Sequence, residues 1–291
     1  MKSITVFTPT FNRAHLLPRL YKSLCDQTSK YFLWLIIDDG SSDNTRELVE
    51  QWIAEDKIEI QYQYKENGGM HTGHNLAYQI IQTPFNTCID SDDYMPINAI
   101  EIITKEIQNL APHYSGIIGL DADKDGNLIG TIIPEYLESC KLYELYTKHG
   151  VLGDKKMVYK SEITKKYPPY PEYQGEKFVP LSYKTLMIDL DYDLKPVNKV
   201  LCIVEYQTDG STRNMLKQYR RNPKGFAFSR ISRIEYGSTF KERFKNAIHL
   251  VSSALFSKDF SWLHKTNKKL VVVVAIHFGI ILNVYIRIKT K

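Results

Sequence analysis

Short apolar runs alternate with helical patterns through the first third of the chain. Each run ends in a polar cluster, and each cluster is followed by apolar residues at helical spacing. The four apolar runs are residues 4–8, 32–37, 58–65 and 87–89, and the helical patterns cover residues 16–24, 45–54, 74–81 and 97–110. Strands and helices that alternate in this way predict right-handed crossovers, and hence an α/β fold with a mainly parallel sheet and helices on both faces.

The pattern changes after residue 110. Two apolar runs, residues 115–120 and 128–133, flank a polar turn and predict an antiparallel hairpin. Residues 200–206 predict a late strand, and helical patterns dominate from there to the end. We therefore expect one α/β domain over residues 1–212, divided near residue 110, and a basic, helical C-terminal region over residues 213–291.

Composition and charge narrow the class of protein. The chain has 291 residues, 43% of them hydrophobic and 24% charged, which is typical of a globular protein rather than a disordered or polytopic membrane protein. The net charge is +5, and basic residues crowd the stretch 213–233, which is either a solvated helix face or a contact with an anionic surface. Nucleic acid is not expected as a partner, because no recognised binding module accompanies this charge. Four scattered cysteines and the lack of a signal-peptide pattern favour the cytoplasm.

A longer apolar run lies close to residue 291. Residues 270–282 are almost entirely apolar and are flanked by lysines and arginine. The run is short for a membrane span, which needs about 20 apolar residues. An interfacial helix over residues 270–286 and a buried core element both explain it.

The acidic motif Asp90-Ser91-Asp92-Asp93 directly follows the fourth predicted strand. Three carboxylates in four residues repel one another, and a divalent cation neutralises such a group. Mg²⁺ and Mn²⁺ prefer oxygen ligands and bind through one or two carboxylates together with substrate phosphates. Acidic loops before helices also serve as caps, so the motif by itself has two explanations.

A second acidic cluster, Asp38-Asp39-Gly40-Ser41, follows the second predicted strand. Its carboxylates can accept hydrogen bonds from a base N–H or a ribose hydroxyl, and Gly40 permits a tight turn. A turn and helix cap explain the same residues. Because the carboxyl ends of parallel strands meet at one edge of a sheet, we expect the polar clusters to line a common cleft.

Four motifs follow one another along the chain: Thr8-Pro9-Thr10-Phe11-Asn12-Arg13, then Ile37-Asp38-Asp39-Gly40-Ser41-Ser42-Asp43, then Asn67-Gly68-Gly69 with Asn75, and finally Asp90-Ser91-Asp92-Asp93. In this order they resemble the motifs of the family-2 glycosyltransferases of GT-A fold. The resemblance covers roughly the first 100 residues. It implies a Rossmann-like GT-A fold, a nucleoside-diphosphate sugar donor bound by residues 1–110, an acceptor half over residues 111–212, inversion at the anomeric carbon, and Mn²⁺ or Mg²⁺ on the diphosphate.

The resemblance also implies roles for particular residues. Thr8, Pro9, Thr10, Asn12 and Arg13 belong to the motif that lines the nucleotide pocket. Asp39, or its neighbour Asp38, contacts the base, and Asn67 and His74 lie nearby. Asp90 and Ser91 contact ribose or sugar, and Asp92 holds the metal. Relatives often carry Arg or Lys where His74 stands, so His74 is equally well explained as a packing residue.

The acceptor side of the family pattern is less complete. Relatives place the general base in a Glu-Asp pair at the start of a helix, and the nearest match is Gly175-Glu176-Lys177. Glu176 is therefore the candidate base, with a surface Glu–Lys ion pair as the alternative. Relatives also carry a loop that closes over the diphosphate, and here Ser211, Thr212 and Arg213 fall at that place.

The sequence thus predicts an inverting transferase that moves sugar from a UDP-sugar to a hydroxyl of a glycan or lipid-linked acceptor. By analogy with the family, we expect it to build bacterial capsule, exopolysaccharide or lipopolysaccharide at the inner face of the plasma membrane, with peripheral membrane contact through the C-terminal region. A nucleotidyltransferase and a non-catalytic, membrane-docked scaffold with a degenerate donor site are the alternatives.

Overall fold

The chain folds into two compact units in a computed structural model that describes residues 2–205 and 214–291. The first unit comprises residues 2–169 and 184–205, and the second comprises residues 170–183 and 214–291. Residues 170–183, which the sequence groups with the acceptor half, thus belong to the second unit. The expected boundary near residue 212 lies outside the described residues.

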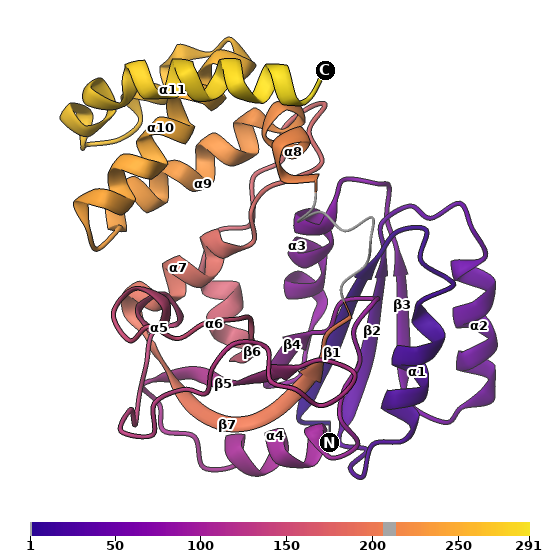
Figure 1. Ribbon diagram of the computed structural model, residues 1–291. Helices are drawn as coiled ribbons and strands as arrows, with labels where there is room; N and C mark the ends of the chain where they lie inside the picture. The colour runs from indigo at the N-terminus through magenta and orange to yellow at the C-terminus, as the bar shows by residue number, and fades with distance from the viewer. Residues whose placement is uncertain (1, 206–213) are drawn as a thin grey trace. The chain divides into compact units, whose positions relative to one another are not determined.

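The first unit is built on a seven-stranded sheet with the order β3-β2-β1-β4-β6-β5-β7 (Figure 1). The strands are β1 (Ile4–Thr10), β2 (Phe32–Asp38), β3 (Ile60–Tyr64), β4 (Phe85–Cys88), β5 (Tyr114–Ala122), β6 (Lys155–Lys160) and β7 (Asp193–Ile203). β1 to β4 pair in parallel, β6 is antiparallel to both of its neighbours, and β5 is parallel to β7. The mainly parallel sheet with a smaller antiparallel part confirms the predicted fold class.

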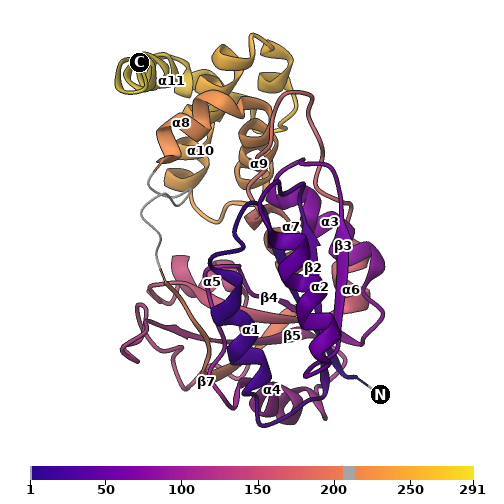
Figure 2. The same cartoon turned by 90° about the vertical axis from the view of Figure 1, so that its right-hand side faces the viewer.

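Helices cover both faces of this sheet. They are α1 (Leu17–Cys25), α2 (Thr45–Glu55), α3 (Met70–Ile80), α4 (Ala99–Ile107), α5 (Leu142–Thr147), α6 (Ser161–Lys166) and α7 (Ser182–Asp191). Side chains alternate along the buried strands, so Val6 and Trp34 pack against α1, α2 and α4, whereas Phe7 and Leu35 pack against α3. Figure 2 shows α1 and α2 lying over one face. Burial on both faces explains why these strands are continuous apolar runs.

The predicted hairpin of residues 115–120 and 128–133 is wrong. β5 is a strand, but its antiparallel neighbour is β6, and residues 128–133 contribute only an isolated bridge between Leu128 and Ala122. β7 also begins seven residues before the predicted late strand. The local turn at residues 123–127 does form, with Asp123 accepting hydrogen bonds from the backbone of Asp125 and Asn127. The turn at residues 123–127 was therefore predicted correctly, but it did not identify β6 as the strand that pairs with β5.

The second unit is helical. Its helices after the undescribed stretch are α8 (Met215–Arg221), α9 (Pro223–Tyr236), α10 (Phe240–Ser257), the short 3₁₀ helix η2 (Phe260–His264) and α11 (Lys269–Lys289). α9, α10 and α11 share a core that includes Ala227, Leu250, Val251 and Ala275. The expectation that the C-terminal apolar segment is short is wrong, because α11 has 21 residues. Among the described residues it is the one helix long and apolar enough to cross a membrane, judged by length and composition alone.

Candidate functional site

The carboxyl ends of β1 to β4 lie side by side in the first unit. The strand register pairs Thr10 with Asp38, Asp38 with Tyr64, and Phe7 with Cys88. The chain builds β1, β2 and β3 in one direction and then places β4 on the other side of β1. Such a reversal of strand order leaves a crevice beyond the strand ends, where ligands of α/β sheets bind. The polar clusters predicted to line one cleft are therefore brought to one edge.

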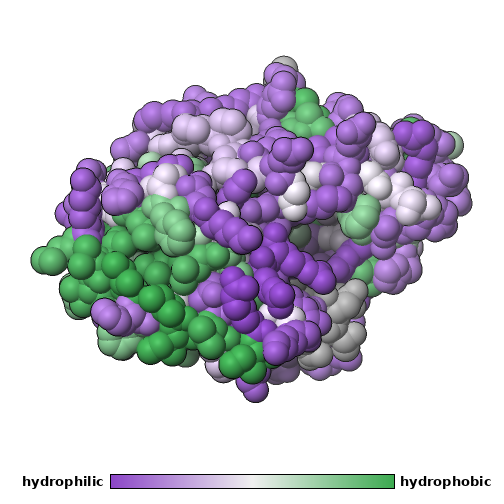
Figure 3. Space-filling model, turned by 90° about the horizontal axis from the view of Figure 1, so that it is seen from above, coloured by the Kyte–Doolittle hydropathy of each residue, from purple (hydrophilic) through white to green (hydrophobic). Residues whose placement is uncertain are grey.

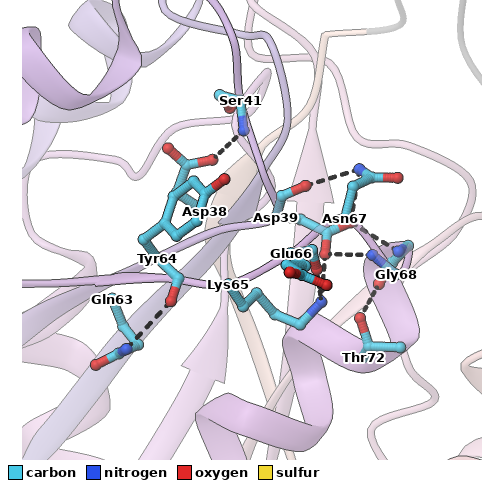
Figure 4. Close-up of polar contacts among 11 residues, drawn as sticks. Asp38, Asp39, Ser41, Gln63, Tyr64, Lys65, Glu66, Asn67, Gly68 and Thr72 are labelled. Atoms are coloured by element: carbon cyan, nitrogen blue, oxygen red, sulfur yellow. Dashed lines mark hydrogen bonds and ion pairs between the residues drawn. The ribbon is translucent and has the colours of Figure 1, made fainter.

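At this edge the carboxylate of Asp39 accepts hydrogen bonds from several groups of the loop after β3 (Figure 4). One carboxylate oxygen accepts hydrogen bonds from Lys65 Nζ at 2.6 Å and from the backbone N–H of Gly68 at 2.9 Å. The other accepts from the backbone N–H of Gly69 at 2.7 Å and from Asn67 Nδ2 at 3.1 Å. The Asp39 side chain is only 5% exposed, so these four donors replace its water. Asp39 and Asn67 thus fix the loop between β3 and α3.

Both carboxylate oxygens of Asp38 also accept hydrogen bonds from within the protein. Its carboxylate accepts the backbone N–H of Ser41 at 2.8 Å and the hydroxyl of Tyr62 at 2.5 Å. Burial, and then this hydrogen bond to Asp38, raise the pKa of Tyr62 above its usual range. Gly40 lies with φ of 84°, and a Cβ at that position would meet the backbone of Asn67. The turn after β2 and the loop after β3 are therefore built against each other.

The first motif contributes one unsatisfied group. Thr8 is buried and its hydroxyl accepts a hydrogen bond from Trp34 Nε1 at 3.0 Å, and Pro9 lies against Gly73 of α3. Thr10 ends β1, and its buried hydroxyl has no hydrogen-bond partner. A buried polar atom without a partner costs free energy unless a ligand or water satisfies it. Asn12 accepts the backbone N–H of Ser42 at 2.7 Å and holds the turn after β2.

The acidic motif lies at the end of β4 and is held by two arginines. Arg13 Nη1 donates to Asp92 Oδ2 at 3.0 Å, and the side chains are 26% and 23% exposed. Arg19 donates to the backbone carbonyl of Asp92 and pairs with Glu205. Burial, and then the charge of Asp90, raise the pKa of Asp92 even though Arg13 lowers it. Ser91 is buried between these acids.

The charged groups that surround Asp93, Lys156 and Asp121 among them, were not predicted from the sequence. Burial, together with the charges of Asp90 and Asp92, raises the pKa of Asp93 to about 8 despite the opposing effect of Lys156. Lys156 comes from β6 and donates to the carbonyl of Cys88 at 3.3 Å. Burial lowers the pKa of Lys156, but the nearby thiol and carboxyl groups, Asp121 among them, hold it well above its ordinary value. A lysine inside the strand 155–160 was the available signal.

His74 sits in a packed environment. It is 5% exposed, makes an edge contact with the ring of Phe7, and lies 3.2 Å from the Tyr78 hydroxyl and 3.7 Å from the Cys88 thiol. Burial lowers the pKa of His74 to about 4, so the ring is neutral at pH 7. Burial likewise lowers the pKa of His71 to about 4, and its Nδ1 is buried without a partner. Both imidazole rings are therefore neutral at pH 7.

Glu176 lies in the second unit and caps a helix. Its two carboxylate oxygens accept the backbone N–H groups of Lys224 at 3.0 Å and Gly225 at 2.9 Å, in the first turn of α9. Burial raises the pKa of Glu176, while these two N–H groups lower it. The alternative explanation of Glu176, a surface ion pair with Lys177, does not describe this carboxylate, because its oxygens are bound by the backbone of α9. Ser211, Thr212 and Arg213 lie outside the described residues.

The residues at the end of β4 fit a divalent cation shared with a substrate. Within residues 2–205 and 214–291, no group of three or more His, Cys, Asp or Glu side chains is arranged to hold a metal by itself. Asp90 and Asp92 instead form a partly exposed acidic pair whose mutual repulsion Arg13 only partly offsets. One or two carboxylates completed by phosphate oxygens is the usual protein contribution to a Mg²⁺ site. The donor set therefore suits a cation that arrives with a diphosphate.

Comparison with known proteins gives one family. Residues 5–166, more than half of the chain, match the model described as Glycosyl transferase family 2. The chondroitin synthase of Pasteurella multocida is 29% identical over 129 residues, which is 43% of this chain and 13% of that protein. The glycosyltransferase GlyG of Streptococcus pneumoniae is 27% identical over 106 residues, 36% of this chain and 35% of that protein. The chain spans about a third or less of the length of the curated relatives it matches.

Solved structures share the fold. S. aureus TarS 1-349 in complex with UDP-GlcNAc has a TM-score of 0.64 at 15% identity, over 98% of this chain and 89% of that one. The mannosyltransferase PcManGT from Pyrobaculum calidifontis, in complex with GDP-Man and Mn²⁺, has a TM-score of 0.56 at 14% identity, over 99% and 88%. At such low identity these likenesses establish the fold alone.

Proposed function

The chain belongs to glycosyltransferase family 2 and is a glycosyltransferase, and we propose that it moves sugar from a UDP-sugar to a hydroxyl group with inversion. The observation that carries the proposal is the gathering of Thr10, Asp39 and Asp92 at one sheet edge, at the point where strand order reverses. A nucleotide with a diphosphate needs both polar base contacts and charge compensation, and this edge supplies residues of both kinds.

Donor binding is the best-supported step. The partnerless hydroxyl of Thr10 and the partnerless Nδ1 of His71 are buried groups that a nucleotide can satisfy. The other candidate residues are proposed chiefly to shape the pocket, because each is packed or has its polar group hydrogen-bonded within the protein. They are Thr8, Pro9, Asn12, Asp38, Asp39, Asn67 and His74. The UDP nucleotide is supported by the UDP-GlcNAc bound in the TarS structure.

Charge at the end of β4 is proposed to serve the diphosphate. Asp92, with Asp90, would hold Mn²⁺ or Mg²⁺, which supplies Lewis-acid stabilisation of the diphosphate leaving group when bound. Arg13 already orients Asp92 and lies where it can donate to phosphate oxygens. Asp90 and Ser91 are proposed to contact the ribose or sugar. Mn²⁺ bound in the PcManGT structure supports the choice of metal.

Inversion requires a base that takes the proton of the acceptor hydroxyl. Glu176 stays the candidate, and its burial-raised pKa suits a base. To act, it would have to exchange at least one backbone N–H of α9 for the acceptor. The acceptor is proposed to be a glycan or lipid-linked oligosaccharide of a bacterial surface polysaccharide, as the chondroitin synthase relative suggests. We also propose a cytoplasmic enzyme at the inner face of the plasma membrane, in peripheral contact with it through the apolar C-terminal helix.

A thermal-shift screen of nucleotide sugars, with Mn²⁺ and with EDTA, tests the proposal. A ligand at 100 times its Kd stabilises the native state by about 2.7 kcal/mol, which corresponds to roughly 5–10 °C for a chain of this size. We expect a UDP-sugar to give the largest shift and EDTA to reduce it. Proton NMR of the product then reports the anomeric configuration. Retention would refute inversion, and the absence of any shift or hydrolysis with every donor would refute donor binding.

A further inference from the structure

Helix α11 has two faces of opposite character. Its inner stripe is buried and consists of Val272, Ala275, Gly279, Asn283 and Ile286. Its outer stripe consists of large apolar side chains that are 45–77% exposed, namely Leu270, Val273, Val274, Phe278, Ile280, Ile281, Val284, Tyr285 and Ile288. The apolar side chains on this side of the molecule form one broad area (Figure 3). An exposed apolar patch of this kind marks an interaction site.

The inner face is fixed on α10. A Cβ at Gly279 would collide with the side chain of Val251, so the glycine permits close contact between the two helices. Asn283 is buried and donates through Nδ2 to the carbonyl of Ser252 at 3.1 Å. If α11 crossed a bilayer alone, this packing would be lost and Asn283 would lie in hydrocarbon. The contacts therefore favour a helix that keeps its place on α10 and exposes only its outer stripe.

The outer stripe continues onto the start of α10. Phe278 makes an edge contact with Phe244, and Phe244 stacks on Phe240, which is 64% exposed. Aromatic and aliphatic side chains thus form one surface across two helices of the same unit. Aromatic rings are enriched at the boundary between lipid headgroups and hydrocarbon.

Charge around this stripe is predominantly positive. Residues 269–291 contain no acidic residue, and lysines or arginine flank the stripe at Lys268, Lys269, Arg287, Lys289 and Lys291. Residues 240–291 contain ten Lys or Arg and two Asp or Glu. Two copies facing each other through α11 would bring these basic ends together, in parallel or antiparallel arrangement. An anionic surface is complementary to them, and basic residues near anionic lipid each favour binding.

We propose that the outer stripe of α11 docks on the surface of a lipid bilayer that carries anionic headgroups, with the helix lying in the plane of the membrane. The apolar side chains enter the boundary between headgroups and acyl chains, and the basic residues at both ends of the helix contact the headgroups. The inner face stays on α10. This inference rests on the peripheral contact of the proposed function and specifies the helix face, the orientation and the lipid charge.

Co-sedimentation of the full chain with vesicles tests the docking. Vesicles of phosphatidylcholine alone are compared with vesicles that contain phosphatidylglycerol as well. We expect binding to the anionic vesicles that weakens with salt. Ile281→Glu should lower the partition coefficient by about 10- to 100-fold, because one large apolar side chain is lost from the lipid and a charge is added. Lys268→Gln with Lys269→Gln should lower it by about fivefold per lysine on anionic vesicles only.

Leu152→Glu is the matched control, because Leu152 of the first unit is 62% exposed and Ile281 is 66% exposed. The control should bind vesicles like the unaltered chain. Equal binding of both variants, or no binding of the unaltered chain, would overturn the proposal. Resistance of the bound protein to extraction with alkaline carbonate would show a spanning helix instead, and dimers in light scattering that Ile281→Glu dissolves would show a second copy as the occupant; either result overturns surface docking.

The vesicle assay is independent of sugar transfer. A chain that shows a thermal shift with a nucleotide sugar but fails to bind anionic vesicles would refute the docking and leave the proposed reaction standing. A chain that binds vesicles through α11 but shows no thermal shift with any donor would refute donor binding and leave the docking standing.

Discussion

Two carboxylates at the ends of the strands on either side of β1 have opposite surroundings. Asp39, after β2, is 5% exposed and accepts hydrogen bonds from four donors of the next loop. Asp92, after β4, is 23% exposed, pairs with Arg13, and has a pKa raised by burial and by Asp90. The difference separates two tasks that a sequence motif cannot separate. Asp39 builds the edge, whereas Asp92 keeps acceptor capacity for a ligand.

Removing the charge of Asp92 should have the largest effect on activity. Asp92→Asn loses the carboxylate proposed to hold the metal, so transfer should fall about a thousandfold, equivalent to about 4 kcal/mol. The free energy of unfolding should change by less than about 1 kcal/mol, because a partly exposed ion pair contributes little. Initial rates and urea unfolding check the two halves of this expectation. Asp125→Asn, which changes an exposed acid in the turn 123–127, is the control.

Asp39 should show the opposite balance. Asp39→Asn replaces an acceptor by a donor that faces backbone N–H groups and leaves Lys65 without its counter-ion, so we expect a loss of about 3 kcal/mol in the free energy of unfolding. Urea denaturation of this variant and of Glu66→Gln, an exposed neighbour, measures it. Unchanged stability of Asp39→Asn would show that the contrast between the two carboxylates is false.

Asp189 extends the comparison to a buried carboxyl group in which one oxygen accepts a hydrogen bond and the other accepts none. It accepts the backbone N–H of Tyr143 at 2.8 Å, and its other oxygen has no partner. Burial raises its pKa to about 7, well above the value of about 3.9 in an unfolded chain. The native state therefore binds more protons between these values, and its stability falls as pH rises through this window. Asp189→Asn should reduce the loss of stability between pH 5 and pH 8 by about 2 kcal/mol, as measured by urea unfolding at both pH values. The exposed Asp191→Asn should leave the loss unchanged.

Glu176 resembles Asp39 in accepting backbone N–H groups with both oxygens, and its substitution should lower stability less than Asp39→Asn does. Glu176→Gln weakens the cap of α9 and should lower the free energy of unfolding by about 1 kcal/mol. If Glu176 is also the general base, kcat should fall at least about a hundredfold in the same variant. Loss of stability without loss of kcat would leave it a helix cap only. Glu172→Gln, an exposed neighbour, is the control.

The sequence predicted the parallel half of the sheet well, because each strand and the polar cluster after it are local signals. It did not predict contacts that come from distant segments. The pairing of β5 with β6 leaves a gap of more than thirty residues between the two strands, and Lys156 reaches the acidic motif from that later strand. Asp39 is hydrogen-bonded by residues 67–69, which lie about thirty residues later in the chain. Glu176 is hydrogen-bonded by a helix that starts at residue 223. Motifs therefore named candidate residues for the site but did not predict the partners of these residues.

The contact of Glu176 with α9 has a consequence for dividing the gene. Residues 170–183 and the helices after residue 214 form one folded unit from two separate stretches, joined also by Phe178 stacked on Phe226 and Tyr173 against Trp262. A truncation that ends before α9 leaves an orphan segment with uncovered aromatic rings inside the remaining protein. Exchange of this unit between relatives would need a crossover at each end of residues 170–183 and a third before α8, so the two stretches should be inherited and engineered together.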